Sequence, residues 1–320
     1  MGHGRGQRQH TKMGGTADGR ITGYRLEVLQ DAGAYVGMGA VLPVMTRMMT
    51  SGVYDIERVE FDSTSVVTNT TPMEAYRGAG RPEATAAIER TIDEFAVACG
   101  IDPAEVRRRN FWAPEAFPLV TKMGTSYDSG EYEKALDAAL SAAGYAELRA
   151  DQAQRRAAGD AVQIGIGLAA YVETTNPMGG PEYGAVEITA DGGAIIRTGS
   201  SSHGQGHQTV WTMIVSEQTG IPMERIEFRF SDTDDIDHGG GTGGSRSLQV
   251  GGTAVKMAAE QVIDQARRLA ADLLEAAVED VQLDVGRAAF HVAGSPAPVV
   301  TWADVAAAAP EPLFAGADFK

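Results

Sequence analysis

One arrangement occurs three times in this sequence and restricts the fold more than any other feature: an apolar strand-like run, a glycine-rich loop, and then a helix-forming run. The loops read AYRGAGRPEA at 75–84, GSSSHGQG at 199–206 and GGGTGGSRS at 239–247. Glycines between a strand and a helix permit backbone conformations that other residues avoid. The pattern therefore predicts an α+β chain in which loops connect strands to the amino ends of helices.

Each of these loops is a candidate anion-binding site. The amino end of a helix presents unpaired N–H groups, and glycine lets an anion approach them closely. Polar side chains at the loops strengthen this interpretation: Arg77, Arg81, Gln205, Ser245, Arg246 and Ser247. A single glycine-rich loop is weak evidence, because turns need glycine in any case. Three such loops, two of them with arginine, favour a negatively charged ligand.

The charge and the cysteine content exclude several classes of function. The chain has 27 lysine and arginine residues against 43 aspartate and glutamate residues, a net charge of −16, which argues against nucleic acid or an anionic membrane as a partner. The single cysteine, Cys99, excludes a disulfide framework or a thiolate-bound zinc or iron–sulfur centre within the chain. No apolar run approaches the roughly 20 residues of a membrane span, and the amino terminus lacks a signal-peptide pattern, so we expect a cytoplasmic protein.

Other motifs carry less weight. The phosphate-binding patterns of the common nucleotide folds are absent, so NAD and ATP are poor candidates. His203 and His207 have the spacing of metal ligands on a helix, but the Gly-Gln-Gly between them should interrupt that helix. The acidic run at 231–241 has its glycine at the wrong offset for a calcium loop and is interpreted as a solvated turn. Cys99 falls on an apolar helical stripe and is interpreted as a core residue.

Local patterns predict the main elements. Apolar alternation predicts a strand pair or one long strand over 20–36 and a short buried strand at 63–70, while the methionine-rich 41–54 is expected to be irregular. Strands continue at 162–175 and through a hairpin whose turn reads ADGG. Helices are predicted from Pro82 to Cys99, from Pro103, over 131–143, over 145–158 and, the longest, over 253–277. These elements divide the chain into a first lobe at 1–112, a helical connector at 113–162 and a second lobe at 163–320.

The three loops, taken in order, resemble a known family. The stretches TNTTPMEAYRGAGRPEA, GSSSHGQGHQT and GTGGSRSLQVGG, joined by DPAEVRRRN and YDSGEYEKALDAAL, are similar to the large, molybdenum-binding subunit of the xanthine oxidase family of molybdenum hydroxylases. The closer likeness is to aerobic-type carbon monoxide dehydrogenase large chains of the AYRGAGR type. The resemblance covers essentially the whole chain and implies a two-lobed molybdopterin-binding fold whose second lobe is incomplete at its carboxyl end.

The resemblance also implies a cofactor and a set of contacts. The cofactor is molybdenum held by the dithiolene of a molybdopterin, commonly the cytosine dinucleotide form in bacteria, with no protein side chain on the metal. Gln205, within Gly204 to Gly206, would lie beside the molybdenum. The pterin and phosphate side would be lined by Gly244, Ser245, Arg246 and Ser247. Arg77 and Gly78 would present backbone near the metal, and Tyr76 and Ala79 would face the substrate channel.

The activity implied by the resemblance is hydroxylation of an electron-poor carbon with oxygen from water. Electrons would leave through iron–sulfur clusters and FAD on partner chains, and the remainder of the large subunit would be a further partner. Carbon monoxide oxidisers carry a copper-binding cysteine in the first loop, where this chain has Gly78-Ala79-Gly80. Purine oxidisers carry an aromatic residue where Ala79 stands. Small-molecule aldehydes or N-heterocycles therefore remain as substrates.

No catalytic residue is assigned from the sequence. The family's general base is a glutamate in a loop near the carboxyl end of the large subunit, and no stretch before Lys320 matches it. Glu83, Glu173 and Glu182 are carboxylates outside that motif and are not given the role. The chain is thus expected to be a fragment, a split subunit or a truncation of an oxidoreductase. The alternative is a truncated, non-catalytic scaffold or assembly partner that retains the fold; a generic phosphate-ligand protein is what the residues alone allow.

Overall fold

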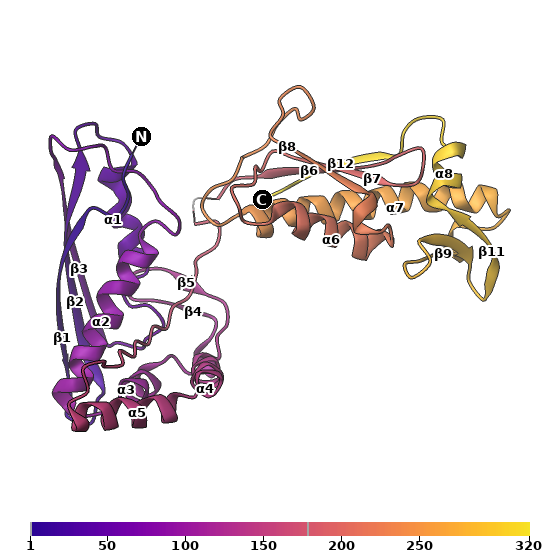
Figure 1. The fold of residues 1–320 in the computed structure, drawn as a ribbon. Coiled ribbons are helices and arrows are strands. Elements are labelled where there is room, and N and C mark those ends of the chain that lie inside the picture. Colours follow the sequence, from indigo (N-terminus) through magenta and orange to yellow (C-terminus); the bar gives the residue numbers. More distant parts are fainter. Residues whose placement is uncertain (1, 178) are drawn as a thin grey trace. The chain divides into compact units, whose positions relative to one another are not determined.

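The computed structural model describes residues 2–177 and 179–320, which fall into two compact units divided between Glu173 and Thr174 (Figure 1). The residues of the predicted helical connector, 113–162, lie within the first unit. The three-part division into 1–112, 113–162 and 163–320 stays a prediction. None of the helices among the described residues is long and apolar enough to cross a membrane.

The first unit contains a three-stranded sheet in the order β1-β2-β3. Strand β1 (Gln7–Gly15) is antiparallel to β2 (Ile21–Gly33), and β2 is parallel to β3 (Arg58–Val67). Helices α1 (Met38–Met48) and α2 (Arg81–Cys99) pack along the sheet. The prediction of one long strand from the apolar alternation is confirmed by β2. The buried side chains of this strand that form the core with α2 are Ile21, Tyr24, Leu26 and Val28.

Two predictions for the sheet of this unit and the helix beside it need correction. Residues 41–48 of the methionine-rich segment are not irregular but belong to α1, despite Pro43 inside it, because Leu42 and Thr46 lie one turn apart on the face that is buried. Residues 49–54 of that segment form turns and a single bridge, as expected of an irregular stretch. The strand predicted at 63–70 as buried ends at Val67 and is mostly exposed, since β3 is at the edge of the sheet. In addition, the polar amino-terminal residues form β1, which the sequence did not indicate.

The capping signals correctly locate the helices that follow. Helix α2 begins after Gly80, whose N–H donates to Glu83 Oε2 at 2.8 Å, and it ends at Gly100 with φ +68°. Helix α3 (Pro103–Asn110) begins after Asp102, whose carboxylate accepts from the Ala104 N–H. Cys99 is half-buried at the end of α2 and so is only at the margin of the core.

The rest of the first unit is short helices and an extended segment. Helices α4 (Tyr132–Ala143) and α5 (Tyr145–Ala158) lie where they were predicted, whereas the two-residue strands β4 (Leu119–Val120) and β5 (Ser126–Tyr127) and the 3-10 turn η1 (Pro114–Ala116) were not predicted. The strand expected at 162–175 is wrong, because 161–173 has no regular structure. Its main chain instead forms hydrogen bonds with buried side chains of α2 and α3. Ala170 N–H donates to Glu89 Oε2 at 3.0 Å, and the Leu168 carbonyl accepts from Arg107 Nη2 at 2.8 Å.

The second unit is built on a four-stranded sheet in the order β12-β6-β7-β8. Strand β6 (Glu182–Ile188) is antiparallel to both β12 (Phe314–Phe319) and β7 (Ala194–Thr198), and β7 is parallel to β8 (Ile226–Phe230). The hairpin predicted from the ADGG turn joins β6 and β7 and is confirmed. Figure 1 shows α6 (His207–Thr219) and α7 (Thr253–Leu273) along one face of this sheet, where their apolar sides form the core.

The remaining elements lie beyond α7 or connect the strands. Helix α7 is the longest helix, as predicted, but it ends at Leu273, where the side chain is already half exposed. A second sheet, in the order β11-β10-β9, and a short helix follow it. The bounds are η2 (Met223–Arg225), η3 (Ser247–Gly252), η4 (Val278–Asp280), β9 (Val281–Asp284), β10 (Ala289–Val292), β11 (Ser295–Thr301) and α8 (Trp302–Ala308).

Candidate functional site

The loop at 199–206 carries the chain from β7 to the amino end of α6. Gly204 and Gly206 have φ of +95° and +79°, which glycine adopts without strain. A Cβ placed on Gly206 would meet nothing within 4 Å, so space is open beside the first turn of α6. The N–H groups of that first turn have no acceptor within the helix. This end of α6 is therefore equipped to bind an anion.

The loop at 239–247 leads into the π-helical turn η3, which continues directly into α7. Gly244 and Ser245 have φ of +63° and +54°, and Arg246 that follows is right-handed at φ −111°. Alternation of left- and right-handed residues turns successive N–H groups toward one point, the geometry of an anion-binding nest. A Cβ placed on Gly241 or Gly243 would meet nothing within 4 Å, so this loop also borders open space.

These two loops lie side by side in the second unit. Thr242 Oγ1 donates to the Ser201 carbonyl at 2.5 Å. A Cβ on Gly199 would lie 2.6 Å from the Cα of Gly239, and a Cβ on Gly239 would lie equally close to the Cα of Gly199. Real Cβ atoms do not approach other carbons so closely, because interiors are packed at van der Waals contact. Both glycines are thus required by the contact between the loops.

The guanidinium of Arg246 is held by residues 179–182 of the second unit. Its Nη2 donates to the Pro181 carbonyl at 2.7 Å and lies 3.4 Å from Glu182 Oε2, and its Nη1 lies 3.4 Å from the Gly179 carbonyl. Its Nε is buried and has no acceptor among the described residues. Arg246 therefore lies at the predicted place, but its charge is already balanced by a carboxylate that sequence reasoning did not connect to it.

The amino ends of α6 and η3 pack through aromatic and glycine contacts. The rings of His207 and Trp211 are 4.5 Å apart, and Trp211 is fully buried. A Cβ on Gly251 or Gly252 would come within 3.3 Å of the Trp211 ring, so these glycines let η3 approach α6 closely. This packing fixes the two helix ends that border the loops.

Burial lowers the pKa of His207, and the neighbouring His203 acts in the same direction, while the Ser201 main chain opposes them. A depressed pKa in the folded state favours the neutral ring, so the stabilisation is complete above the ordinary value of about 6.5 and is lost as pH falls through the folded-state pKa. We expect the second unit to become less resistant to urea below about pH 6.5. His207→Phe keeps a ring against Trp211 and should reduce that pH dependence; an unchanged dependence contradicts this assignment.

The glycine-rich loop at 75–84, in the first unit, is held by Arg5 near the amino terminus. Arg5 Nη2 donates to the Arg77 carbonyl at 2.6 Å, Arg5 Nη1 pairs with Glu83 Oε2 at 3.2 Å, and its guanidinium lies over the Tyr76 ring. Gly78 and Gly80 have φ of +79° and +87°. No sequence signal marked Arg5, because its partners are more than seventy positions away.

Two further contacts define this loop. A Cβ on Gly80 would lie 2.3 Å from Met45 Cβ, so glycine is required where the loop crosses α1. Arg81 pairs through Nε with Glu173 Oε2 at 2.8 Å. Tyr76 is exposed. The predicted residues Tyr76, Arg77, Gly78 and Ala79 thus belong to a loop with a defined conformation, and their roles stay predictions.

The structure brings the two second-unit loops together along 199–201 and 239–242. Within the loop at 239–247, Ser247 Oγ donates to Thr242 Oγ1 at 3.5 Å. Gln205 turns its side-chain oxygen back to accept from the His203 N–H. The predicted residues that these loops carry are Gly204, Gln205, Gly206, Gly244, Ser245, Arg246 and Ser247, and their contacts to a cofactor stay predictions.

The weaker candidates have local explanations. His203 Nε2 lies 3.1 Å from Ser201 Oγ, and no group of three or more potential metal ligands occurs within the part of the chain that the structure describes. The acidic run is not a purely solvated turn, because Asp235 pairs with Arg197 at 2.8 Å and this arginine is mostly buried. The three spare carboxylates, Glu83, Glu173 and Glu182, all have arginine partners.

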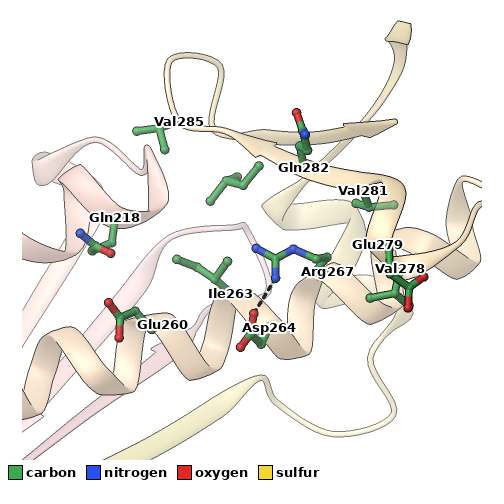
Figure 2. A pocket seen from close by; sticks show the side chains of 11 residues that line it. Gln218, Glu260, Ile263, Asp264, Arg267, Val278, Glu279, Val281, Gln282 and Val285 are labelled. Carbon is green, nitrogen blue, oxygen red and sulfur yellow. Dashed lines mark hydrogen bonds and ion pairs between the residues drawn. The ribbon is translucent and has the colours of Figure 1, made fainter. Parts of the chain in front are cut away.

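Figure 2 shows a different hollow in the second unit, between α7, the end of α6 and the segment at 278–285. It shares no residue with the two loops. Three carboxylates, those of Glu260, Asp264 and Glu279, line it, and Arg267 is paired with Asp264 at 2.6 Å. This excess of negative charge disfavours an anionic ligand there.

Two family descriptions of a molybdopterin cofactor-binding domain match the chain, one over residues 1–111 and the other over 138–319. The chain therefore belongs to the molybdopterin-binding large subunits of the xanthine oxidase family. The predicted family and the α+β molybdopterin-binding fold are confirmed.

Individual relatives agree with this membership. The carbon monoxide dehydrogenase large chain of Hydrogenophaga pseudoflava is 37% identical over 310 residues, which are 92% of this chain and 38% of the relative. A 6-hydroxypseudooxynicotine dehydrogenase complex subunit gamma from Paenarthrobacter nicotinovorans is 35% identical over 308 residues, 94% of this chain and 38% of its own length. The chain thus spans about two fifths of the length of these relatives.

Solved structures show the same relationship. Quinoline 2-oxidoreductase from Pseudomonas putida 86 is similar with a TM-score of 0.86 and 29% identity, over 98% of this chain and 42% of that one. Reconstituted carbon monoxide dehydrogenase from Oligotropha carboxidovorans gives a TM-score of 0.79 with the same identity and coverage.

The second-unit loops fit an anionic pterin cofactor. Hydrogen-bond donors are present at the first turn of α6 and in the turn at Gly244 to Arg246, and open space borders Gly206 and Gly241. Hydroxyl groups of Ser245 and Ser247 add neutral donors. Side-chain donors of this kind bind phosphate without requiring a net positive surface, which the acidic chain does not have.

Proposed function

We propose that this chain is the molybdenum-cofactor-binding part of an oxidoreductase that hydroxylates an aldehyde or an N-heterocycle with oxygen from water. The observation that carries the proposal is the side-by-side placement of two glycine-rich loops at the amino ends of α6 and η3, with open space beside both. The location we propose is the cytoplasm, with neither nucleic acid nor membrane as a partner.

The residues of the chain would bind and orient the cofactor, which we propose to be the cytosine dinucleotide form. Molybdopterin, when bound, supplies the redox centre. The amides of the first turn of α6 and of Gly244 to Ser247 would hold its anionic groups, and the Gln205 side chain would donate beside the metal. Arg77 and Gly78 would contribute main chain on the substrate side, and Tyr76 and Ala79 would border the substrate. Electrons would pass to iron–sulfur and FAD partner subunits.

The names of several relatives favour an N-heterocycle within this class of substrate. Those of a nicotine 6-hydroxylase large subunit and of quinoline 2-oxidoreductase refer to nitrogen-containing rings. The relatives named for carbon monoxide are a weaker guide, because Gly78-Ala79-Gly80 offers no thiolate and Cys99 lies at the far end of α2. Ala79 also leaves more room than the aromatic residue of purine oxidisers.

A non-catalytic scaffold or assembly role is the second candidate, and one observation favours it. Glu83, Glu173 and Glu182 are each paired with an arginine, which favours a structural role for these three carboxylates. The experiment that separates the candidates purifies the chain with its native partners and measures molybdenum, pterin and turnover in ¹⁸O-labelled water.

Stoichiometric molybdenum and pterin, with the label appearing in hydroxylated pyridine or quinoline substrates or in acids formed from aldehydes, would support the enzyme. Loaded cofactor without turnover on any of these substrates would favour the scaffold. A clean complex with neither molybdenum nor pterin would refute both the proposed cofactor and the proposed activity.

A further inference from the structure

Glu182, the first residue of β6, occupies the space between the two second-unit loops. Glu182 is 1% exposed, and its side chain is fully buried. Oε1 accepts from the N–H groups of Tyr183 at 2.9 Å and Gly240 at 3.1 Å. Oε2 accepts from Ser200 Oγ at 2.7 Å and lies 3.4 Å from Arg246 Nη2. One carboxylate therefore joins β6, the loop at 199–206 and the loop at 239–247.

The glycines that bring the loops together also surround this carboxylate. A Cβ on Gly199 would lie 2.9 Å from Glu182 Oε1, and one on Gly239 would lie 2.7 Å from the same oxygen. A Cβ on Gly251, at the end of η3, would lie 3.3 Å from Glu182 Cγ. The two loops and η3 are thus folded closely around the side chain, and three glycines make that approach possible.

The charge of Glu182 requires Arg246. A buried carboxylate is costly unless it is paired and hydrogen-bonded, and Arg246 is the cation within reach among the described residues. In return, Glu182 and the carbonyls of Pro181 and Gly179 take up the terminal nitrogens of the guanidinium. The charge of Arg246 is therefore neutralised, and its side chain serves to hold the loop at 239–247. An anion would be bound mainly by the main-chain amides of the two loops.

We infer that Glu182 is a positioning residue that holds Arg246 and the amide of Gly240, and so presets the two loops for the cofactor. This inference deepens the proposed function and rests on it only where cofactor retention is concerned. The placement of the loops is a property of the cofactor-free chain and is measurable by itself.

Glu182→Gln tests the inference because it changes the charge with little change of shape. The Gln carbonyl oxygen still accepts from Tyr183 and Gly240, and its NH2 group still meets the Ser200 hydroxyl. That NH2 group, however, faces the donors of Arg246 and cannot accept from them. The variant should selectively release Arg246.

In the cofactor-free chain, we expect Glu182→Gln to speed amide hydrogen exchange at 241–247 about tenfold, with little change in α7 and β7. Ser200→Ala is the matched control, since it removes a different contact of the same carboxylate and should leave exchange at 241–247 unchanged. Arg246→Met should speed exchange at 241–247 at least as much, because it also leaves the buried Glu182 carboxylate without its cation. Unchanged exchange in Glu182→Gln, or exchange that rises equally throughout the second unit, would overturn the inference.

In the assembled complex, Glu182→Gln should lower pterin retention about tenfold, the scale on which loss of an outer-sphere partner acts. Combined with Arg246→Met it should have no additional effect, because Glu182 acts through Arg246. Additive losses would contradict that route. If the unaltered complex holds no pterin, the proposed function fails, whereas the exchange measurement still decides whether Glu182 positions the loops.

Discussion

Gly206→Leu is expected to lower the molybdenum and pterin content of the purified complex by about tenfold or more, the range seen when cofactor contacts are lost. Gly206 ends the loop at 199–206, and among the described residues no heavy atom outside its immediate chain neighbours lies within 4 Å of the position its Cβ would occupy. A leucine side chain there would enter the open space beside the first turn of α6. It would therefore exclude the ligand without a clash against the protein itself.

The matched control for this variant is Gly159→Leu, because both glycines are left-handed. Gly159 ends α5 with φ +68°, close to the +79° of Gly206, and its Cβ position is also open. The strain of a left-handed leucine, about 1–2 kcal/mol, should be similar at the two sites. Cofactor content measured by metal analysis and pterin fluorescence should fall only in Gly206→Leu. Equal losses in both variants would show that backbone strain, and not the space beside α6, is responsible.

Arg107→Met is expected to destabilise the first unit by about 3–5 kcal/mol, as measured when one partner of a buried ion pair is removed. The Arg107 side chain is fully buried. Its Nε pairs with Glu89 Oε2 and its Nη1 with Asp93 Oδ1, both at 2.8 Å, and Nη2 donates to the Leu168 carbonyl at 2.8 Å. Burial already raises the pKa of Glu89, and Arg107 opposes that rise. Loss of the arginine would therefore leave the buried Glu89 carboxylate without a cation, and the segment at 161–173 would lose its hydrogen bond at the Leu168 carbonyl.

The adjacent Arg108 supplies the control for that stability measurement. Arg108 makes ion pairs with Glu105, Glu133 and Asp137, all partly exposed. Exposed pairs contribute little, so Arg108→Met should cost no more than about 1 kcal/mol. Urea unfolding followed by amide exchange in α2 and α3 measures both variants. Similar losses at the two positions would contradict the importance given to burial.

Local signals were sufficient for most helices of this chain. Asp102 followed by Pro103 marked the start of α3, and Gly100 marked the end of α2, because capping depends on residues within one turn. The alternation along Ile21–Gly33 likewise predicted β2. Elements determined by tertiary packing were missed: β1 is a polar strand that exists by pairing with β2, and α1 forms although it contains Pro43.

The candidate site was only partly predictable for a similar reason. Glycine, serine and arginine at the loops, including Gly206 and Arg246, could be found because the strand–loop–helix pattern is local. The carboxylate that connects them could not, since Glu182 lies 58 and 64 positions from Gly240 and Arg246. Arg5, which holds the loop of the first unit, is still farther from its partners. Contacts of such sequence separation leave no periodicity or motif in a single sequence.

The central claim, that the loops at 199–206 and 239–247 together bind the anionic cofactor, is tested most directly by amide hydrogen exchange compared between cofactor-loaded and cofactor-free complex. We predict protection in the loaded state concentrated at 203–209 and 240–247. Protection that spares both segments and falls instead on the hollow of Figure 2, at Glu260 to Arg267 and 278–285, would contradict the claim.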